Sequence, residues 1–192
     1  MELFISICIG IGLAASSGFR IFVPMLAANI AGLSGFHQFG SGFEWLNTWT
    51  AFGILASASV AEIAAYYIPI LDNALDHIAL PVAVAAGTLL SASFISADIS
   101  PALKWGLGLL AGGGTAGVIH SGMAMLRLGS TAATGTLANP LVTTAENGAS
   151  ITFSLMALLV PIVLAVLVLF LVIYILRKIS RSVGKRRSKK DV

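Results

Sequence analysis

Charged side chains are scarce in this chain. Asp, Glu, Lys and Arg make up 10% of its 192 residues, whereas 57% of the residues are hydrophobic. An ordinary soluble domain carries about 25% charged residues, and a folded domain of this size still exposes about 30% of the surface of its unfolded chain. The composition therefore excludes a water-soluble globule, and it predicts that lipid covers the remaining apolar surface.

Cysteine is almost absent as well. The single cysteine, Cys8, lies in an apolar stretch, so an internal disulfide is excluded and no thiolate metal site is indicated. The first apolar run begins Met1-Glu2-Leu3 and continues past Gly18. Because it has neither a basic start nor a convincing cleavage site, we interpret it as a retained membrane span and not as a secretory signal.

Basic residues are rare outside the C-terminal tail. Eight of the eleven lie in residues 177–192, whereas residues 1–176 contain three basic and seven acidic residues, a formal charge of −4. A basic tail that directly follows an apolar run is typical of a positive-inside anchor beside anionic lipid headgroups. We therefore expect a bacterial inner-membrane protein with a cytoplasmic C-terminus, whose partners are membrane lipids and not nucleic acid.

Hydropathy predicts an all-α, polytopic membrane bundle with about six membrane segments. Five clear spans lie at about 3–31, 50–69, 78–97, 102–126 and 149–176, each with the roughly 20 residues that cross hydrocarbon. A weaker segment at 128–147 consists of small and hydroxyl residues, so it must be shielded by protein, as a central span or a re-entrant hairpin. Six crossings place both termini in the cytoplasm, whereas five place the N-terminus outside; we favour six.

Within this single transmembrane domain of residues 1–176, the segment 33–49 differs from the spans. Its residues Phe36, Phe39, Phe43, Leu46 and Trp49 are spaced three or four positions apart, with polar residues between them. Such a pattern favours an amphipathic helix or helical hairpin that lies in the membrane interface.

The two halves of the domain, 1–98 and 102–176, resemble one another weakly. Residues 14–22 are similar to 113–121, and Pro69 with Asp72 is echoed by Pro140 with Glu146. Three segments per half would form an inverted repeat, the arrangement of many transporters, which place their sites at the repeat interface. The alternative is that matches of this kind arise from a composition rich in small residues.

Arg20 is the most unusual residue because it lies inside the first apolar run. A charge at the centre of a membrane helix costs about 2.5–3.5 kcal/mol unless it is paired or faces water. The neighbouring Ser17, Gly18 and Pro24 predict a broken or kinked span around it. Arg20 either binds an anionic substrate, or pairs with the buried Glu62, or extends to the membrane interface.

Other polar residues at membrane depth extend this candidate site. Glu62 lies on a helix of small side chains and either carries protons or neutralises Arg20. His120 follows a glycine run that favours tight helix packing, and it either contacts a ligand or hydrogen-bonds to a neighbouring helix. The candidate substrate-binding residues are Arg20, Glu62, His120, Ser17, Tyr66 and Asn139, and the candidate proton- or ion-coupling residues are Glu62, Asp72, Asp76 and Glu146.

Catalytic and metal-binding patterns are weak. Asp72, Asp76 and His77 lie near one another in sequence and offer oxygen and nitrogen ligands for a cation. A helix cap near Asp72 is the alternative explanation of the same residues. No nucleophile with an adjacent base is found in the sequence. We therefore expect neither an enzyme nor a bound metal or cofactor.

Four motifs carry a resemblance to a known family. They are the string Gly12–Leu26, the string Tyr67–Asn73, the triplet Ala138-Asn-Pro, and the pair Glu146-Asn147 ahead of the last apolar run. Their order resembles the bacterial membrane family catalogued as domain of unknown function 4126, over about residues 8–170. The resemblance implies a compact polytopic membrane domain and supplies no reaction or substrate.

The sequence thus predicts a small transporter or channel for a small polar or anionic solute or ion, with its site at mid-membrane between two helical halves. One alternative is a flippase or scramblase for lipid or polyprenyl phosphate, in which Arg20 binds phosphate. A second is a scaffold without transport activity. Because 192 residues make a small transporter, a homodimer is a further expectation.

Overall fold

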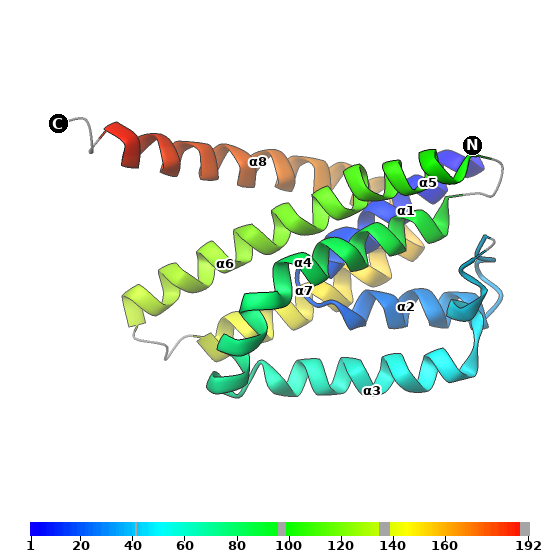
Figure 1. Ribbon diagram of the computed structural model, residues 1–192, viewed down its shortest axis with the longest axis horizontal. Helices are drawn as coiled ribbons and strands as arrows, with labels where there is room; N and C mark the ends of the chain where they lie inside the picture. Colours follow the sequence, from blue (N-terminus) through cyan, green and yellow to red (C-terminus); the bar gives the residue numbers. More distant parts are fainter. Residues whose placement is uncertain (41, 96–98, 135–138, 189–192) are drawn as a thin grey trace.

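The computed structural model describes residues 1–40, 42–95, 99–134 and 139–188, and it is helical without a strand in these ranges. This agrees with the all-α class predicted from the sequence. In chain order the elements are α1 (Glu2–Ser17), α2 (Phe22–Leu33), the 3-10 helix η1 (Glu44–Asn47), α3 (Trp49–Ala65), α4 (Pro69–Phe94), α5 (Pro101–Leu107), the π-helix η2 (Gly108–Gly113), α6 (Gly114–Thr134), α7 (Asn139–Leu159) and α8 (Pro161–Ser188) (Figure 1).

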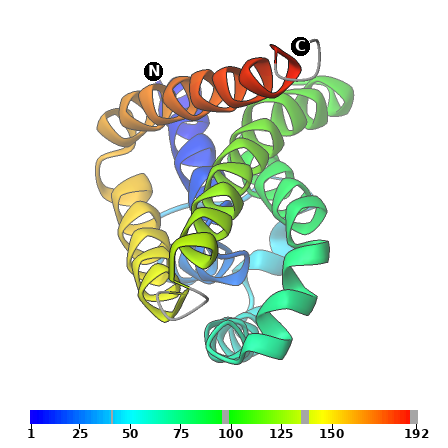
Figure 2. The same ribbon diagram turned by 90° about the vertical axis from the view of Figure 1, so that its left-hand side faces the viewer.

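Helix α1 forms the centre of the bundle, surrounded by α4, α6, α7 and α8 (Figure 2). Its residues Leu13 and Ala14 are fully buried. Small side chains make this position possible: a Cβ atom added at Gly12 would lie 2.8 Å from both Ala157 and Leu164. The C-terminal end of α1, which leads into the Arg20 segment, is therefore enclosed by protein.

The single span expected over residues 3–31 is two helices. α1 ends at Ser17 and α2 begins at Phe22, so the break predicted around Arg20 is confirmed. However, α2 does not continue away from the N-terminus but runs back toward that end of the bundle, so that α1 and α2 form a hairpin (Figure 1). Hydropathy reports that both helices are apolar but not that the chain reverses, so the structure has a helical hairpin where one continuous span was expected.

The later helices alternate in direction. α3, the continuous rod of α5, η2 and α6, and α8 run away from the N-terminal end, whereas α4 and α7 return to it, so the two termini lie at opposite ends (Figure 1). The weak segment 128–147 is divided between the end of α6 and the start of α7, with 135–138 outside the described residues. The apolar run 149–176 is divided at Val160, after which Pro161 begins α8, as expected for proline in a first helical turn.

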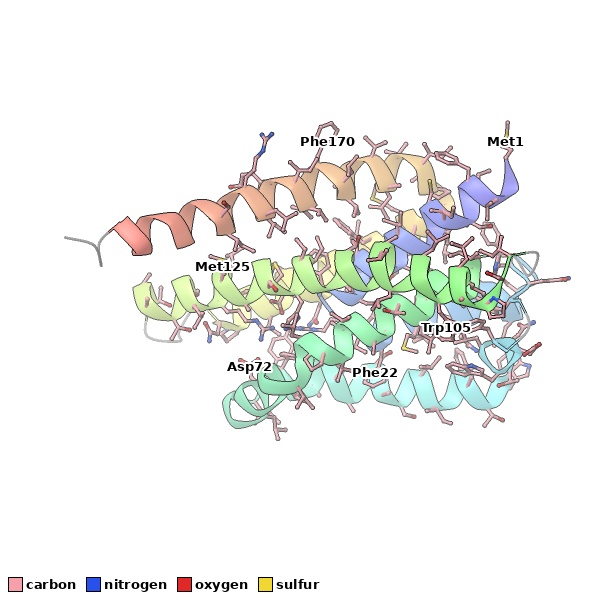
Figure 3. All side chains as sticks on the ribbon, turned by 45° about the horizontal axis from the view of Figure 1, so that its top comes forward. Met1, Phe22, Asp72, Trp105, Met125 and Phe170 are labelled. Atoms are coloured by element: carbon pink, nitrogen blue, oxygen red, sulfur yellow. The ribbon has the colours of Figure 1, made fainter. Side chains whose placement is uncertain are left out.

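Two described helices are long and apolar enough to cross a membrane, Pro101–Thr134 and Pro161–Ser180. The other apolar helices are shorter, namely Leu3–Ser17, Phe22–Leu33, Trp49–Ala65 and Ile78–Phe94. Large apolar side chains on α8 point outward, as Figure 3 shows for Phe170, which is 68% exposed. These features support a membrane location.

Glycines bring the middle of the α5–α6 rod into backbone contact with α4. A Cβ atom on Gly112 would lie 2.3 Å from the carbonyl oxygen of Gly87 and 2.4 Å from Cβ of Ser91. On the other helix, a Cβ atom on Gly87 would lie 2.7 Å from Cβ of Ala116. The tight helix contact predicted for the glycine run is thus confirmed.

The described part of the segment 33–49 is mostly a loop, so the amphipathic helix or helical hairpin predicted there is wrong. α2 ends at Leu33, and within the described part of the segment only Glu44–Asn47 forms a short 3-10 helix. The ring of His37 stacks on Phe94 with 4.2 Å between the ring centroids. Burial against the aromatic rings lowers the pKa of His37 below its usual range.

Candidate functional site

Arg20 lies in the break between α1 and α2, and it is only 1% exposed. Its Nε donates a hydrogen bond to Oδ1 of Asn147 at 2.6 Å. Its Nη1 donates to the carbonyl oxygen of Phe19 at 3.0 Å and lies 2.9 Å from Oε2 of Glu146. Because the chain leaves the helix here, the carbonyl of Phe19 is free to accept from the guanidinium. The break and α7 together compensate the burial of this charge.

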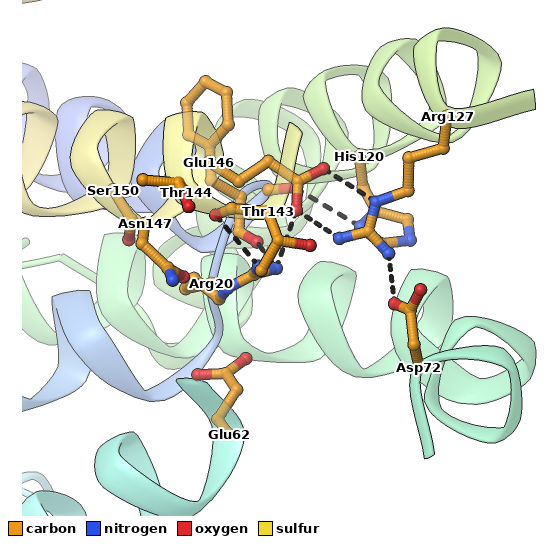
Figure 4. Close-up of polar contacts among 12 residues, drawn as sticks. Arg20, Glu62, Asp72, His120, Arg127, Thr143, Thr144, Glu146, Asn147 and Ser150 are labelled. Carbon is orange, nitrogen blue, oxygen red and sulfur yellow. Dashed lines mark hydrogen bonds and ion pairs between the residues drawn. The ribbon is translucent and has the colours of Figure 1, made fainter. Parts of the chain in front are cut away.

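Glu146 on α7 is shared between two arginines (Figure 4). Its Oε2 contacts both Nη1 of Arg20 and Nη2 of Arg127, and its Oε1 accepts a hydrogen bond from Nε of Arg127 at 2.9 Å. Arg127, on α6, therefore holds the carboxylate with two nitrogens, the strongest geometry for this pair. Glu146 itself is only 2% exposed.

Asp72 extends the cluster toward the end of the bundle where α6 ends. Nη1 of Arg127 donates to Oδ1 of Asp72 at 2.8 Å. Asp72 and Arg127 are 8% and 9% exposed, compared with 1% for Arg20. Positive and negative side chains therefore alternate from the deeply buried Arg20 to the shallower Asp72. The predicted helix cap is wrong, because Ile68 is the N-cap of α4 and Asp72 lies within its first turn.

Tyr66 joins the two arginines at the end of α3. The guanidinium carbon of Arg20 lies 3.9 Å from the centroid of the Tyr66 ring, and that of Arg127 lies 4.8 Å from it. A cation on an aromatic face is attracted by about 0.5–2 kcal/mol, most strongly where water is excluded. The aromatic ring thus helps to stabilise two like charges near one carboxylate.

Glu62 caps the start of α2. Its Oε1 accepts from the backbone N–H of Ile21 at 2.7 Å, and its Oε2 accepts from that of Phe22 at 3.0 Å. A carboxylate at a helix N-terminus satisfies free N–H groups and complements the helix dipole. The salt-bridge partner of Arg20 is Glu146 and not the predicted Glu62, which instead fixes the return of the chain after the break.

The comparison with protein families matches residues 7–181 to the family described as Domain of unknown function (DUF4126). The chain belongs to this family. No curated protein and no solved structure matches it. The resemblance noted from the four sequence motifs is therefore confirmed at the level of the family.

The remaining predicted site residues of this DUF4126 domain lie around the cluster or away from it. Nδ1 of His120 is 3.3 Å from the carbonyl oxygen of Gly18, at the break. Ser17 donates to the carbonyl of Leu13 in its own helix, and Asn139 accepts from Thr131 at 3.3 Å. The side chain of Asp76 lies outside the described part of the chain.

The site residues predicted from the sequence do not include Arg127, Asn147 and Thr143. Arg127 lies between two predicted segments, although it is one of just three basic residues before the tail. That rarity, ahead of a segment too polar for lipid, was the available signal. Asn147 and Thr143 contact Arg20 across more than 120 positions of sequence, and no local pattern indicates such pairs.

Two cavities of the DUF4126 domain adjoin this cluster. A cavity of about 10 Å³, roughly the space for one water molecule, lies between the two arginines, His120 and Glu146. A larger one of about 340 Å³ lies between α3 and α4, beside the start of α2. Its walls are apolar apart from Glu62 and Tyr66 and consist of Ile21, Phe22, Ala58, Ala61, Glu62, Ala65, Tyr66, Leu75, Ile78, Ala79 and Val82.

Replacing Glu62 by glutamine is expected to lower the free energy of unfolding by about 0.5–2 kcal/mol, the usual value of a lost helix cap. The amide keeps one acceptor for the N–H groups of Ile21 and Phe22 but loses the charge that favours the helix N-terminus. The measurement is chemical unfolding of the purified protein in detergent.

The matched control is Glu44→Gln, because Glu44 also accepts a backbone N–H, from Gly42, but is solvent-exposed. Its change should stay within about 0.5 kcal/mol. Equal effects of the two substitutions would contradict a capping role for Glu62.

Proposed function

We propose that this DUF4126 domain is a membrane transporter or channel for a small anion. In this proposal α3, α4, the α5–α6 rod, α7 and α8 cross the membrane, and the α1–α2 hairpin enters from the side of the N-terminus and returns to it. The basic tail then lies in the cytoplasm and the N-terminus outside. The proposal is supported by the opposite positions of the termini and by two helices of membrane-crossing length.

The observation that carries the proposal is the position of Arg20. A helix break inside a bundle exposes backbone polar groups only where protein or a polar cavity surrounds them, and in transporters such breaks hold substrates and coupling ions. Arg20 is 1% exposed at this break, beside Glu146 and a cavity of about 10 Å³. A purely structural bundle would be at least as stable with well-packed apolar side chains in place of the whole set of buried ion pairs.

Access to this site is closed in the structure. Asp72, Arg127 and Glu146 form a continuous set of ion pairs between Arg20 and the end of the bundle where α6 terminates. An anion that moves through the protein must therefore separate Arg127 from a carboxylate. We interpret the ion pairs as the closed gate of the transporter.

The flux of nitrate into proteoliposomes tests the function. Nitrate is small, monovalent and remains charged at neutral pH, so it does not cross the bilayer as a neutral acid. The protein is expected to raise the flux above that of protein-free vesicles. Arg20→Lys should lower the flux by about tenfold or more. Lysine keeps the positive charge but lacks the planar guanidinium group, whose nitrogens reach both Asn147 and Glu146.

Arg177→Lys is the matched control, because Arg177 lies exposed on α8, and its flux should equal that of the unchanged protein. Absence of flux for nitrate, chloride and sulfate would refute an anion transporter. Normal flux through Arg20→Lys would refute the site.

The cavity of about 340 Å³ between α3 and α4 supports a second candidate, a lipid flippase or scramblase. Its apolar walls fit a hydrocarbon chain, and Tyr66 at its wall leads to the two arginines. Fluorescently labelled phospholipid in the same vesicles separates the two candidates. Scrambling without nitrate flux would favour lipid movement, and the reverse result would favour the anion.

A further inference from the structure

Glu146 lies where a bound anion would be expected. Two guanidinium groups, from the α1–α2 break and from α6, converge on its single carboxylate. Both of its oxygens are engaged, and the side chain is 2% exposed. Two arginines around one carboxylate is the arrangement by which proteins recognise free carboxylates and other oxyanions.

The surroundings of this carboxylate leave space for exchange. The cavity of about 10 Å³ borders Arg20, Arg127 and Glu146, and His120 also lines it. The head of the Glu146 side chain lies between the two guanidiniums (Figure 4) and lines this cavity together with them. If that head moves aside, the space that it leaves and the cavity together accept a group about the size of a carboxylate and one water molecule.

We propose that the Glu146 carboxylate acts as a tethered anion, which occupies the binding site of a small monovalent oxyanion such as a short carboxylate. This inference rests on the proposed function and names its substrate class. A free oxyanion takes the place of Glu146 between Arg20 and Arg127, and the two guanidiniums retain a negative partner throughout the exchange. A monovalent anion restores the charge that Glu146 supplied, whereas a divalent anion adds an excess negative charge to a buried site.

The variant Glu146→Ala tests the inference, because the atoms removed from glutamate correspond to those of acetate. Acetate should raise the thermal unfolding midpoint of this variant saturably, by about 2–4 °C at roughly five times its dissociation constant. The reference anion is gluconate at the same ionic strength, since it is too large for the site. In the unchanged protein, acetate should have no more effect than gluconate.

Two further probes separate charge from size. Acetamide has the shape of acetate without its charge, and pivalate has its charge on a bulkier group. Neither should stabilise Glu146→Ala. Stabilisation by acetamide would overturn the inference in favour of simple cavity filling, and stabilisation by pivalate would overturn it in favour of a nonspecific anion effect.

Asp72→Ala is the matched control variant. It also removes a carboxylate from Arg127, but at the shallower end of the cluster, where the pair is 10% and 11% exposed at its side chains. Acetate should not stabilise this variant, because Glu146 still occupies the position between the two arginines. Equal responses of both variants would overturn the assignment to the two-arginine position.

Glu146→Ala removes the carboxylate between the guanidiniums of Arg20 and Arg127, which leaves two buried positive charges next to each other. The variant protein is therefore purified in parallel in acetate and in gluconate. If it folds poorly, its monodisperse yield by size-exclusion chromatography becomes the measurement, and acetate should increase that yield several-fold. No increase in yield and no shift in the midpoint would overturn the inference.

Nitrate flux distinguishes this inference from the function on which it rests. Acetate rescue of Glu146→Ala without flux of nitrate, chloride or sulfate through the unchanged protein would retain the oxyanion site and refute transport. Nitrate flux without acetate rescue would retain transport and refute the tethered anion.

Discussion

Replacement of Arg20 by methionine is expected to lower the free energy of unfolding by about 3 kcal/mol. Breaking a buried ion pair costs about 3–5 kcal/mol, because the partner stays buried without compensation. The lower end applies here, since Glu146 keeps its two contacts with Arg127. Asn147 and the carbonyl of Phe19 also lose their donor. Denaturant unfolding in detergent micelles measures the change.

Arg177→Met provides the control for this substitution. The same side chains are exchanged, but Arg177 is exposed on α8, and exposed substitutions change stability by about 0.5 kcal/mol or less. If Arg20→Met unfolds at the same denaturant concentration as Arg177→Met, the ion pair with Glu146 does not stabilise the bundle. The interpretation of the cluster as a closed gate would then lose its energetic basis.

The sequence predicted the features that depend on local chemistry. An arginine between Gly18 and Pro24 in an apolar run indicated a helix break, and the structure has one from Gly18 to Ile21. The glycine run indicated close helix contact, and Gly112 touches the backbone of α4. Both predictions needed only the properties of a few neighbouring residues.

Features that depend on the path of the chain were not predictable in this way. The reversal of α2 depends on Glu62, which caps it from 40 positions later in the sequence. The partner of Arg20 is Glu146 on α7, whereas the sequence offered Glu62 as one alternative because it also lies within a predicted span. Hydropathy measures the affinity of a segment for lipid and contains no information on which helices become neighbours.

The boundary between α7 and α8 shows the same limitation. Residues 149–176 are almost uniformly apolar, so a single span was predicted, but the chain turns at Val160. Pro161 was the only local indication, since proline is common in the first turn of a helix. The shift of this boundary still leaves two helices after the α5–α6 rod. The change from six crossings to the five that we propose comes from the α1–α2 hairpin, and five crossings place the termini on opposite sides.

Replacement of Gly112 by leucine is expected to destabilise the bundle by about 3 kcal/mol, at the upper end of the usual cost of overpacking. Its Cβ atom alone would lie 2.3 Å from the Gly87 carbonyl oxygen, which is backbone and cannot rotate away. The α5–α6 rod and α4 would have to separate along their contact. Thermal unfolding and the yield of monodisperse protein measure the loss.

The same substitution at Gly106 isolates the effect of the helix contact. Gly106 lies on the same rod, but a Cβ atom there meets no heavy atom within 4 Å. Gly106→Leu should therefore be neutral or slightly stabilising, because leucine favours the helix over glycine by up to about 1 kcal/mol. A similar loss at both positions would mean that the rod does not depend on its approach to α4. Asp72 lies on α4 and Arg127 lies on the rod. A loss of stability in Gly112→Leu but not in Gly106→Leu would therefore also indicate that this helix contact aligns the two residues in the charged cluster.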